Sequence, residues 1–373
     1  DQNALLGRLD IRQTKHLLRQ IRADGFSTVQ NDILAGKATK SKSFFRFFVI
    51  FLYIVCFTAK PRARTTRFCV GRRSFLFTKR TDLALEAREL WQESAEKTTR
   101  LRGVKAAKHK REGYPVTRVD ILDPEGERAL GKPRGSYLTI DLTSFWRRGA
   151  DFFPRAVRAV GSELRELLPP EGPVLVVGLG NRAMTPDAVG PLTLEHLLIT
   201  RHLISAMPRQ FSGFRPVAAF RTGVLGTTGV ESAEAVRGLV EQVHPSLVIA
   251  IDALASRRCQ RVCATVQLSN TGIVPGSGVG NHRWALDQKT LSVPVFSIGI
   301  PTVVDAATLA ADLLEEQGLT VEESQLRRGR AKPMMVTPRD IDAQVRDLAK
   351  VVGYGINWAL QDLEIDEITA LLA

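Results

Sequence analysis

The strongest constraint on the fold is a series of short apolar runs between Val174 and Pro301, separated by segments whose apolar residues have helical spacing. Short apolar runs bounded by Gly, Pro and polar residues predict buried strands. Their alternation with helices is typical of a three-layer α/β/α sandwich with a mostly parallel sheet. The predicted strands are Val174–Val177, Pro216–Phe220, Ser246–Asp252, Ala264–Ser269 and Val293–Pro301, and the predicted helices are Leu192–Ser205, Ser232–Val243 and Ala306–Gln317.

Further elements flank this series. Thr81 and Asp82 precede a run with apolar residues at helical spacing, which predicts an N-cap and an amphipathic helix. A Pro directly after a capping Thr, as at Thr337-Pro338, predicts the start of a closing helix. The other predictions are strands at Tyr114–Leu122 and Gly135–Leu142, a helix at Phe152–Leu168, a charged loop at Lys105–Arg111 and a polar connector at residues 318–333.

The net charge of +13 resides in the first part of the chain. Residues 1–80 hold 17 Lys and Arg but only 4 Asp and Glu, and the remainder holds 35 of each. The body therefore lacks the basic surface of a nucleic-acid-binding protein. The apolar run Phe47–Ala59 is shorter than the about 20 residues of a membrane span. We expect residues 1–70 to be an extension outside the fold, with a weak membrane anchor or a small ordered element as alternatives.

Gly178-Leu179-Gly180 follows a predicted strand and resembles the start of a dinucleotide-binding fingerprint. That fingerprint needs a helix beginning at the glycines and an acidic residue after the second strand. Pro186 and Pro191 follow too soon for such a helix, and no Asp or Glu occurs from Thr200 to Val217. We therefore interpret the glycines as a tight exit from the strand.

Asp187 lies just beyond one predicted strand, and Asp252 ends another. In open parallel sheets the functional crevice lies beyond the carboxyl ends of the strands, so the two carboxyls are expected to converge there. Close carboxyls share one proton, and such a pair can activate water and polarise a carbonyl. The alternative is that each Asp only caps the helix that follows it.

The loop Ile273–Arg283 is rich in glycine, which permits close approach of a ligand chain. Its amides could bind the backbone of a substrate, and the alternative is a flexible crossover. No G-K-[ST] sequence closes it, so it does not fit a phosphate-binding loop. Asp305 also follows a strand, and we interpret it as the carboxylate at a helix N-terminus.

Several strings, in order along the chain, resemble the germination protease family of spore-forming bacteria. They are "RTDLALEA" (Arg80–Ala87), "VVGLGN" with "TPDAVGP" (within Val176–Pro191), "LLITRHL" (Leu197–Leu203), "VIAIDALA" (Val248–Ala255), "TGIVPGSGVGN" (Thr271–Asn281), "IGIPTVVDA" (Ile298–Ala306) and "MVTPRDID" (Met335–Asp342). They span most of the chain after Arg80, so together they are far more specific than any one motif.

This resemblance implies an endopeptidase of the aspartic type that degrades small acid-soluble spore proteins at germination. It implies a homotetramer in the spore core of the cytoplasm, with no cofactor, no direct nucleic-acid contact and no membrane association, and a fold akin to the hydrogenase-maturation proteases. The implied catalytic pair is Asp187 and Asp252. The implied substrate-binding residues are Gly276, Ser277, Gly278, Gly280 and Asn281.

The family is made as an inactive precursor, so the resemblance also implies a propeptide at 71–82, a peptidase domain at 83–373 and self-cleavage between Asp82 and Leu83. The chain departs from the family pattern at residues 1–65, which have no counterpart, and in the segment between Leu314 and Met334, which is shorter. It also has Asn270 where the family often has Asp.

Two alternatives to the aspartic-type peptidase stay open at this point. A metal-dependent peptidase could use His282 and Asp187 as ligands, although the chain has only 6 His and no H-E-x-x-H sequence. A non-catalytic nucleic-acid-associated or membrane-associated protein would rest on the basic N-terminal extension alone.

Overall fold

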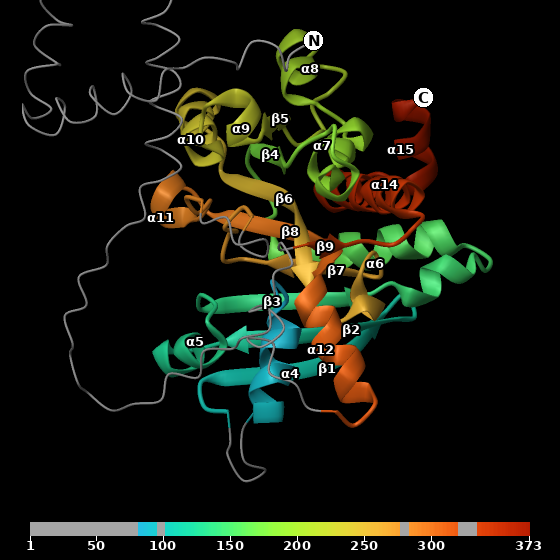
Figure 1. Cartoon of the computed structure of the whole chain (residues 1–373). Coiled ribbons are helices and arrows are strands. Elements are labelled where there is room, and N and C mark those ends of the chain that lie inside the picture. Colours follow the sequence, from blue (N-terminus) through green and yellow to red (C-terminus); the bar gives the residue numbers. More distant parts are fainter. Residues whose placement is uncertain (1–80, 95–100, 277–282, 320–333) are drawn as a thin grey trace, which may run out of the picture. The chain divides into compact units, whose positions relative to one another are not determined.

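The computed structural model describes residues 81–94, 101–276, 283–319 and 334–373 (Figure 1). The expected extension at 1–70, the first part of the expected propeptide and nearly all of the connector at 318–333 lie outside these residues. The strands are β1 Val104–Arg111, β2 Tyr114–Ile121, β3 Gly135–Asp141, β4 Val174–Leu179, β5 Val217–Gly223, β6 Leu247–Ser256, β7 Thr265–Ser269, β8 Val295–Asp305 and β9 Met335–Val336. The α-helices are α4 Ala84–Ser94, α5 Pro124–Leu130, α6 Phe152–Leu167, α7 Val189–Thr193, α8 Arg201–Ala206, α9 Leu225–Thr228, α10 Ser232–Val243, α11 Gln288–Leu291, α12 Ala306–Glu316, α14 Ile341–Leu360 and α15 Ile365–Leu372.

The strands form one 9-stranded sheet in the order β1-β2-β3-β7-β8-β6-β4-β5, and β9 pairs with β8. The α/β class is confirmed. The neighbours β5, β4, β6 and β8 are parallel, but the remaining pairs are antiparallel, so the sheet is mixed rather than mostly parallel. For β1 and β2 the reason is their connection Glu112-Gly113, which is too short for the crossover that a parallel pair requires.

The charged segment at Lys105–Arg111 is not a loop, as the sequence predicted, but most of strand β1. This strand lies at the edge of the sheet, and its central residues are exposed on both faces. An exposed edge strand needs no alternation of apolar residues, and lysines on it oppose pairing with other chains. The sequence pattern of a half-buried strand was therefore absent.

Helices cover both faces of the sheet, which confirms the three layers. One core includes Ile249 and Ile251 of β6, packed with residues of α6, α7 and α14. A second includes Val248 and Ala250 of the same strand, packed with residues of α10. A third joins α4 and α5 to the β2–β3 part of the sheet. Since adjacent residues of β6 enter different cores, its side chains alternate between the two layers of helices.

The predicted helix Ser232–Val243 is confirmed as α10. The predicted helix Leu192–Ser205 is wrong, because the chain breaks there into α7, a 3-10 turn and α8. The N–H of Leu198 donates to Oδ1 of Asn357 at 2.9 Å, so a contact with α14 replaces a helical hydrogen bond. Thr337 is not an N-cap either: its hydroxyl donates to the carbonyl of Thr302 at 3.1 Å, and α14 begins later.

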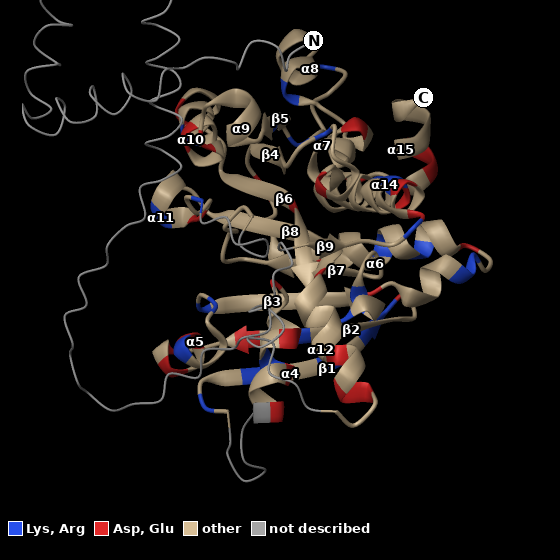
Figure 2. Cartoon of the chain, viewed as in Figure 1, with Lys and Arg blue, Asp and Glu red and all other residues tan. Residues whose placement is uncertain are grey.

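Acidic and basic side chains occur together on several elements, although β1 carries only basic ones and α12 only acidic ones (Figure 2). Helix α5, for example, carries Glu125 and Glu127 with Arg128. Within the described part of the chain, no helix is long and apolar enough to cross a membrane.

Candidate active site

Asp187 and Asp252 come from neighbouring parts of the sheet. Asp252 is in β6, which pairs in parallel with β4, and Asp187 ends the 3-10 turn Thr185–Asp187 that follows β4. The pairing of β4 with β6 ends at Gly178 and Ile251, so Asp252 lies just beyond it, at the edge where β4 leads into the turn that carries Asp187. Burial is the main cause of the raised pKa of Asp252, and the charge of Asp187 is the second.

The glycines after β4 make this approach possible. Gly180 has a φ of 102°, and a Cβ there would lie 2.1 Å from the carbonyl oxygen of Asp187. A Cβ at Gly190 would lie 2.4 Å from the carbonyl oxygen of Leu179 and 2.6 Å from that of Ile251. The chain after Asp187 therefore packs directly on the ends of β4 and β6. The interpretation of the first glycine pair as a tight strand exit fits this geometry, and no helix begins at the glycines.

The Asp187 carboxyl is partly exposed and is held by the turn before it. The N–H of Asn181 donates to its Oδ2 at 2.7 Å. Burial raises the pKa of Asp187 above its ordinary value, and the Asn181 hydrogen bond opposes that rise by favouring the charged form. Asp187 does not cap a helix through its side chain, because α7 begins at Val189 without a side-chain cap.

Asp252 is only 4% exposed. Burial raises its pKa well above the ordinary value, and the nearby charges of Asp187 and Asp82 raise it further. The N–H groups of Ala253 and Gly276 donate to it and partly oppose the rise. Two carboxyls with raised pKa values at one strand edge are the arrangement that favours a shared proton.

The segment before α4 lies against the strand that carries Asp252. The N–H of Asp82 donates to the carbonyl of Ala255 at 2.9 Å, and the N–H of Ala255 donates to Oδ2 of Asp82 at 2.8 Å. Leu83, the next residue, is fully buried. The bond predicted to be cut, Asp82–Leu83, thus lies against β6, where its partner Ala255 is three residues after Asp252.

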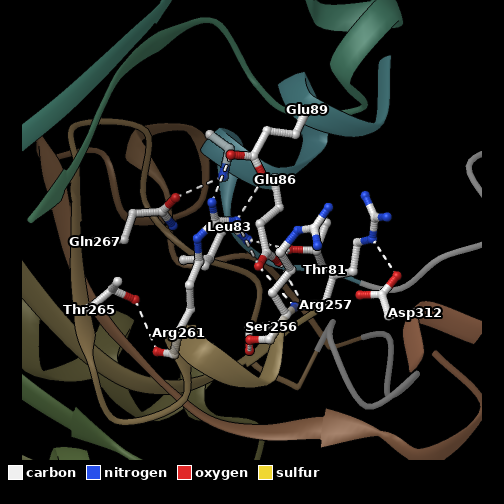
Figure 3. A network of polar contacts seen from close by, with 12 residues as sticks. Thr81, Leu83, Glu86, Glu89, Ser256, Arg257, Arg261, Thr265, Gln267 and Asp312 are labelled. Carbon is white, nitrogen blue, oxygen red and sulfur yellow. Dashed lines mark hydrogen bonds and ion pairs between the residues drawn. The ribbon is translucent and has the colours of Figure 1, made fainter. Parts of the chain in front are cut away.

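A buried carboxylate holds this arrangement together, and sequence reasoning missed it. Glu86 of α4 is fully buried and accepts hydrogen bonds from the backbone N–H groups of Arg257 and Arg258, at 2.6 and 3.1 Å. The guanidinium of Arg261 donates to it at 2.9 Å (Figure 3). Helix α4 is therefore tied to the turn that follows β6. The available signal was a Glu among apolar residues in "DLALEA".

The structure describes only some of the other residues that the sequence predicted for the site. Of the glycine-rich loop, Gly276 donates to Asp252, whereas Ser277, Gly278, Gly280 and Asn281 lie outside the described residues, as does His282. Asp305 caps α12, as predicted, by accepting from the N–H groups of Ala307 and Thr308.

Asn270 links two strands through its side chain. Its Oδ1 accepts from the N–H of Ser136 at 2.9 Å, which links the end of β7 to the start of β3. An Asp at this position would offer the same acceptor. Asn270 therefore gives no reason to expect an impaired site.

Among the described residues, no group of three or more His, Cys, Asp and Glu side chains could hold a metal ion. The carboxyl pair therefore does not belong to a larger ligand set within that part of the chain. The metal-dependent alternative requires His282, which lies outside the described residues.

The chain matches known proteins over most of its described length. Residues 84–316 match the family model described as germination protease. A germination protease from Caldanaerobacter subterraneus subsp. tengcongensis is 43% identical, over 76% of this chain and 94% of that protein. One from Clostridium perfringens (strain ATCC 13124) is 40% identical, over 80% of this chain and 100% of that protein.

Among solved structures, a NiFe hydrogenase maturation protease from Thermococcus kodakarensis KOD1 matches 52% of this chain and 99% of its own. The identity is 14% and the TM-score is 0.30, so this likeness carries no argument about the site. The family match and the curated relatives decide the question: the chain belongs to the germination protease family and is a peptidase.

Proposed function

We propose that this protein is an endopeptidase that initiates degradation of small acid-soluble spore proteins during germination, with Asp187 and Asp252 acting together on one water molecule. Membership of the germination protease family supports the process and the type of reaction. The observation that supports the mechanism is the placement of both carboxyls beyond the paired ends of β4 and β6, where burial raises the pKa of each.

The surroundings of the carboxyls favour different protonation states. Asp252 is the more deeply buried and retains the proton, whereas Asp187 is partly exposed and accepts an N–H that favours its charged form. Asp187 then takes a proton from water, and Asp252 donates a hydrogen bond to the carbonyl under attack. The water oxygen bonds to the carbonyl carbon, the C–N bond breaks and a proton passes to the leaving nitrogen. The products are a carboxyl group and an amine.

We further propose that the protein is a precursor that cleaves itself between Asp82 and Leu83. The pairing of Asp82 with Ala255 supports this step, because it holds the bond near Asp252 within one chain. A homotetramer located in the spore core, without a cofactor, belongs to the same proposal and rests on the family resemblance.

The test compares wild type with Asp187→Asn and Asp252→Asn, using a small acid-soluble spore protein as substrate. Both variants are expected to lose cleavage while retaining the circular dichroism spectrum of the fold. Asp347→Asn is the control, since Asp347 pairs only with the exposed Arg148 in the contacts that we describe. Cleavage retained by both site variants would refute the assignment. Loss of wild-type cleavage in a metal chelator would favour the metal-dependent alternative.

A further inference from the structure

Gln267 of β7 lies in the same cross-strand row as Asp252. Gln267 pairs with Gly299 of β8, and Gly299 pairs with Asp252 of β6. Paired residues of adjacent strands place their side chains on the same face, so Gln267 and Asp252 share one face, about 10 Å apart across two strand spacings. The residue between them has no side chain.

The burial of neighbouring residues confirms this orientation. Val266 and Leu268, on either side of Gln267, enter the core beneath α6 and α14, as does Ile251 next to Asp252. Gln267 and Asp252 therefore both point to the other face, where α4 lies. Gln267 is 7% exposed, and a polar side chain this buried in an apolar strand needs partners.

The partners of Gln267 are backbone groups on either side of Leu83. Its Oε1 accepts from the N–H of Ala84 at 2.8 Å, which fixes the orientation of the amide. Its Nε2 then donates to the carbonyl oxygen of Asp82 at 3.4 Å. Figure 3 shows the side chain reaching from β7 toward this segment. The Gln267 amide therefore makes hydrogen bonds with the backbone on both sides of Leu83.

We propose that Gln267 is a catalytic residue of this peptidase, which donates to the carbonyl oxygen of the bond being cut and accepts from the backbone N–H of the second residue beyond that bond. This inference rests on the proposed self-cleavage between Asp82 and Leu83. A substrate chain that replaces the Thr81–Ala84 segment makes the same contacts, because both involve only backbone atoms of the bound chain.

The length of the Nε2 contact suits this role. When water adds to the carbonyl carbon of Asp82, negative charge develops on its oxygen, and a donor already aimed at that oxygen binds it more strongly than before. A bond of 3.4 Å in the uncleaved chain can shorten as the charge grows. Bond breakage then leaves a carboxyl on Asp82 and an amine on Leu83, with the proton delivered to the Leu83 nitrogen.

The experiment uses the full chain with Gln267→Met, which keeps the length of the side chain but has no donor, and Gln267→Glu, which keeps only the acceptor when ionised. Measured quantities are the first-order rate of self-cleavage, kcat and KM on a small acid-soluble spore protein, and Tm. Gln242→Met on α10 is the matched control, since Gln242 is exposed near the end of α10 that precedes the start of β6.

Both Gln267 variants are expected to lose about 10²- to 10³-fold in kcat and in self-cleavage rate, as for removal of one oxyanion donor. KM should change by about tenfold or less, as expected for one neutral hydrogen bond. A purely structural role predicts instead a lower Tm with kcat within about threefold of wild type, and that result overturns the inference. If wild type itself cleaves nothing, the proposed function fails as well. Wild-type cleavage that is lost in Asp252→Asn but kept in both Gln267 variants rejects the role of Gln267 alone.

Discussion

Asp82 and Ala255 exchange two hydrogen bonds, one between their backbones and one from the Ala255 N–H to the Asp82 carboxylate. Ala255 lies on the same strand as Asp252, so this pair fixes the position of the segment before α4 relative to the candidate carboxyls. It ties the segment that carries the proposed cleavage bond to the strand that carries one of the proposed catalytic carboxyls.

The first prediction concerns the Asp82 side chain. Asp82→Ala removes the acceptor of the Ala255 N–H, and a hydrogen bond to a charged group contributes about 1.5–3 kcal/mol. Self-cleavage should slow by about tenfold to a hundredfold, measured by mass spectrometry over time. Asp82→Asn keeps a neutral acceptor and should fall between wild type and Asp82→Ala. Equal rates in all three proteins would show that the pairing does not position the bond.

The second prediction concerns the buried Glu86. Its removal leaves the Arg257 and Arg258 N–H groups and the Arg261 guanidinium without this acceptor. Glu86→Ala should lower the free energy of unfolding by about 3–5 kcal/mol, as for breaking a buried ion pair. Glu89→Ala removes a partner of the same Arg261 that is 28% exposed, and should cost about 1 kcal/mol or less. Urea unfolding monitored by tryptophan fluorescence measures both, and similar losses would contradict the account.

The third prediction follows from the raised pKa of Asp252. The folded protein keeps a proton that the unfolded chain releases near the ordinary carboxyl pKa of about 4. The stability from protonated Asp252 is therefore fully present below about pH 4 and is lost as the pH rises through the higher folded-state pKa. Asp252→Asn cannot ionise, so its Tm relative to uncleaved wild type should increase with pH over that interval. A constant difference in Tm would contradict the raised pKa.

The fourth prediction tests the close packing that positions Asp187. Gly190→Ala places a Cβ against the carbonyl oxygens of Leu179 and Ile251, so it should lower both stability and activity. Gly238 of α10 is exposed, and a Cβ there meets nothing within 4 Å. Gly238→Ala should stabilise the protein by up to about 1 kcal/mol without changing activity. Thermal unfolding and a cleavage assay measure the stability and the activity of both variants. If Gly190→Ala changes neither, the ends of β4 and β6 are not as tightly packed as described.

The fifth prediction concerns Asn270, where the family often has Asp. Because Oδ1 of either residue can accept the Ser136 N–H, Asn270→Asp should leave the rate of cleavage within about twofold of wild type. A gain of more than about tenfold would mean that a carboxylate at this position takes part in catalysis.

The sequence predicted the strands that carry the site because their residues are apolar and buried. Val174–Val177 lies within β4, and Ser246–Asp252 overlaps β6 from Leu247 on, so the positions of Asp187 and Asp252 at one sheet edge followed from the parallel pairing. The antiparallel strands were harder to predict from the sequence. Strand β1 is exposed and charged, and its place depends on pairing with β2 rather than on burial.

Gln267 and Glu86 were missed for a related reason. Each is a single polar residue within an apolar pattern, and its partners come from segments distant in the sequence: Gln267 contacts Ala84, and Glu86 contacts Arg257. Periodicity identifies buried positions but not the partners of a buried polar group. The broken helix at Leu192–Ser205 has the same origin, since Asn357 of α14 takes the Leu198 N–H.

The central claim is that Asp187 and Asp252 titrate as one pair. Carbon NMR of protein labelled in its Asp carboxyl groups measures this directly by comparing the Asp252 pKa in uncleaved wild type and in Asp187→Asn. Removal of the Asp187 charge should lower the Asp252 pKa, because that charge contributes to its elevation. Asp347→Asn should leave it unchanged. An Asp252 pKa that is the same in wild type and in Asp187→Asn would contradict the account.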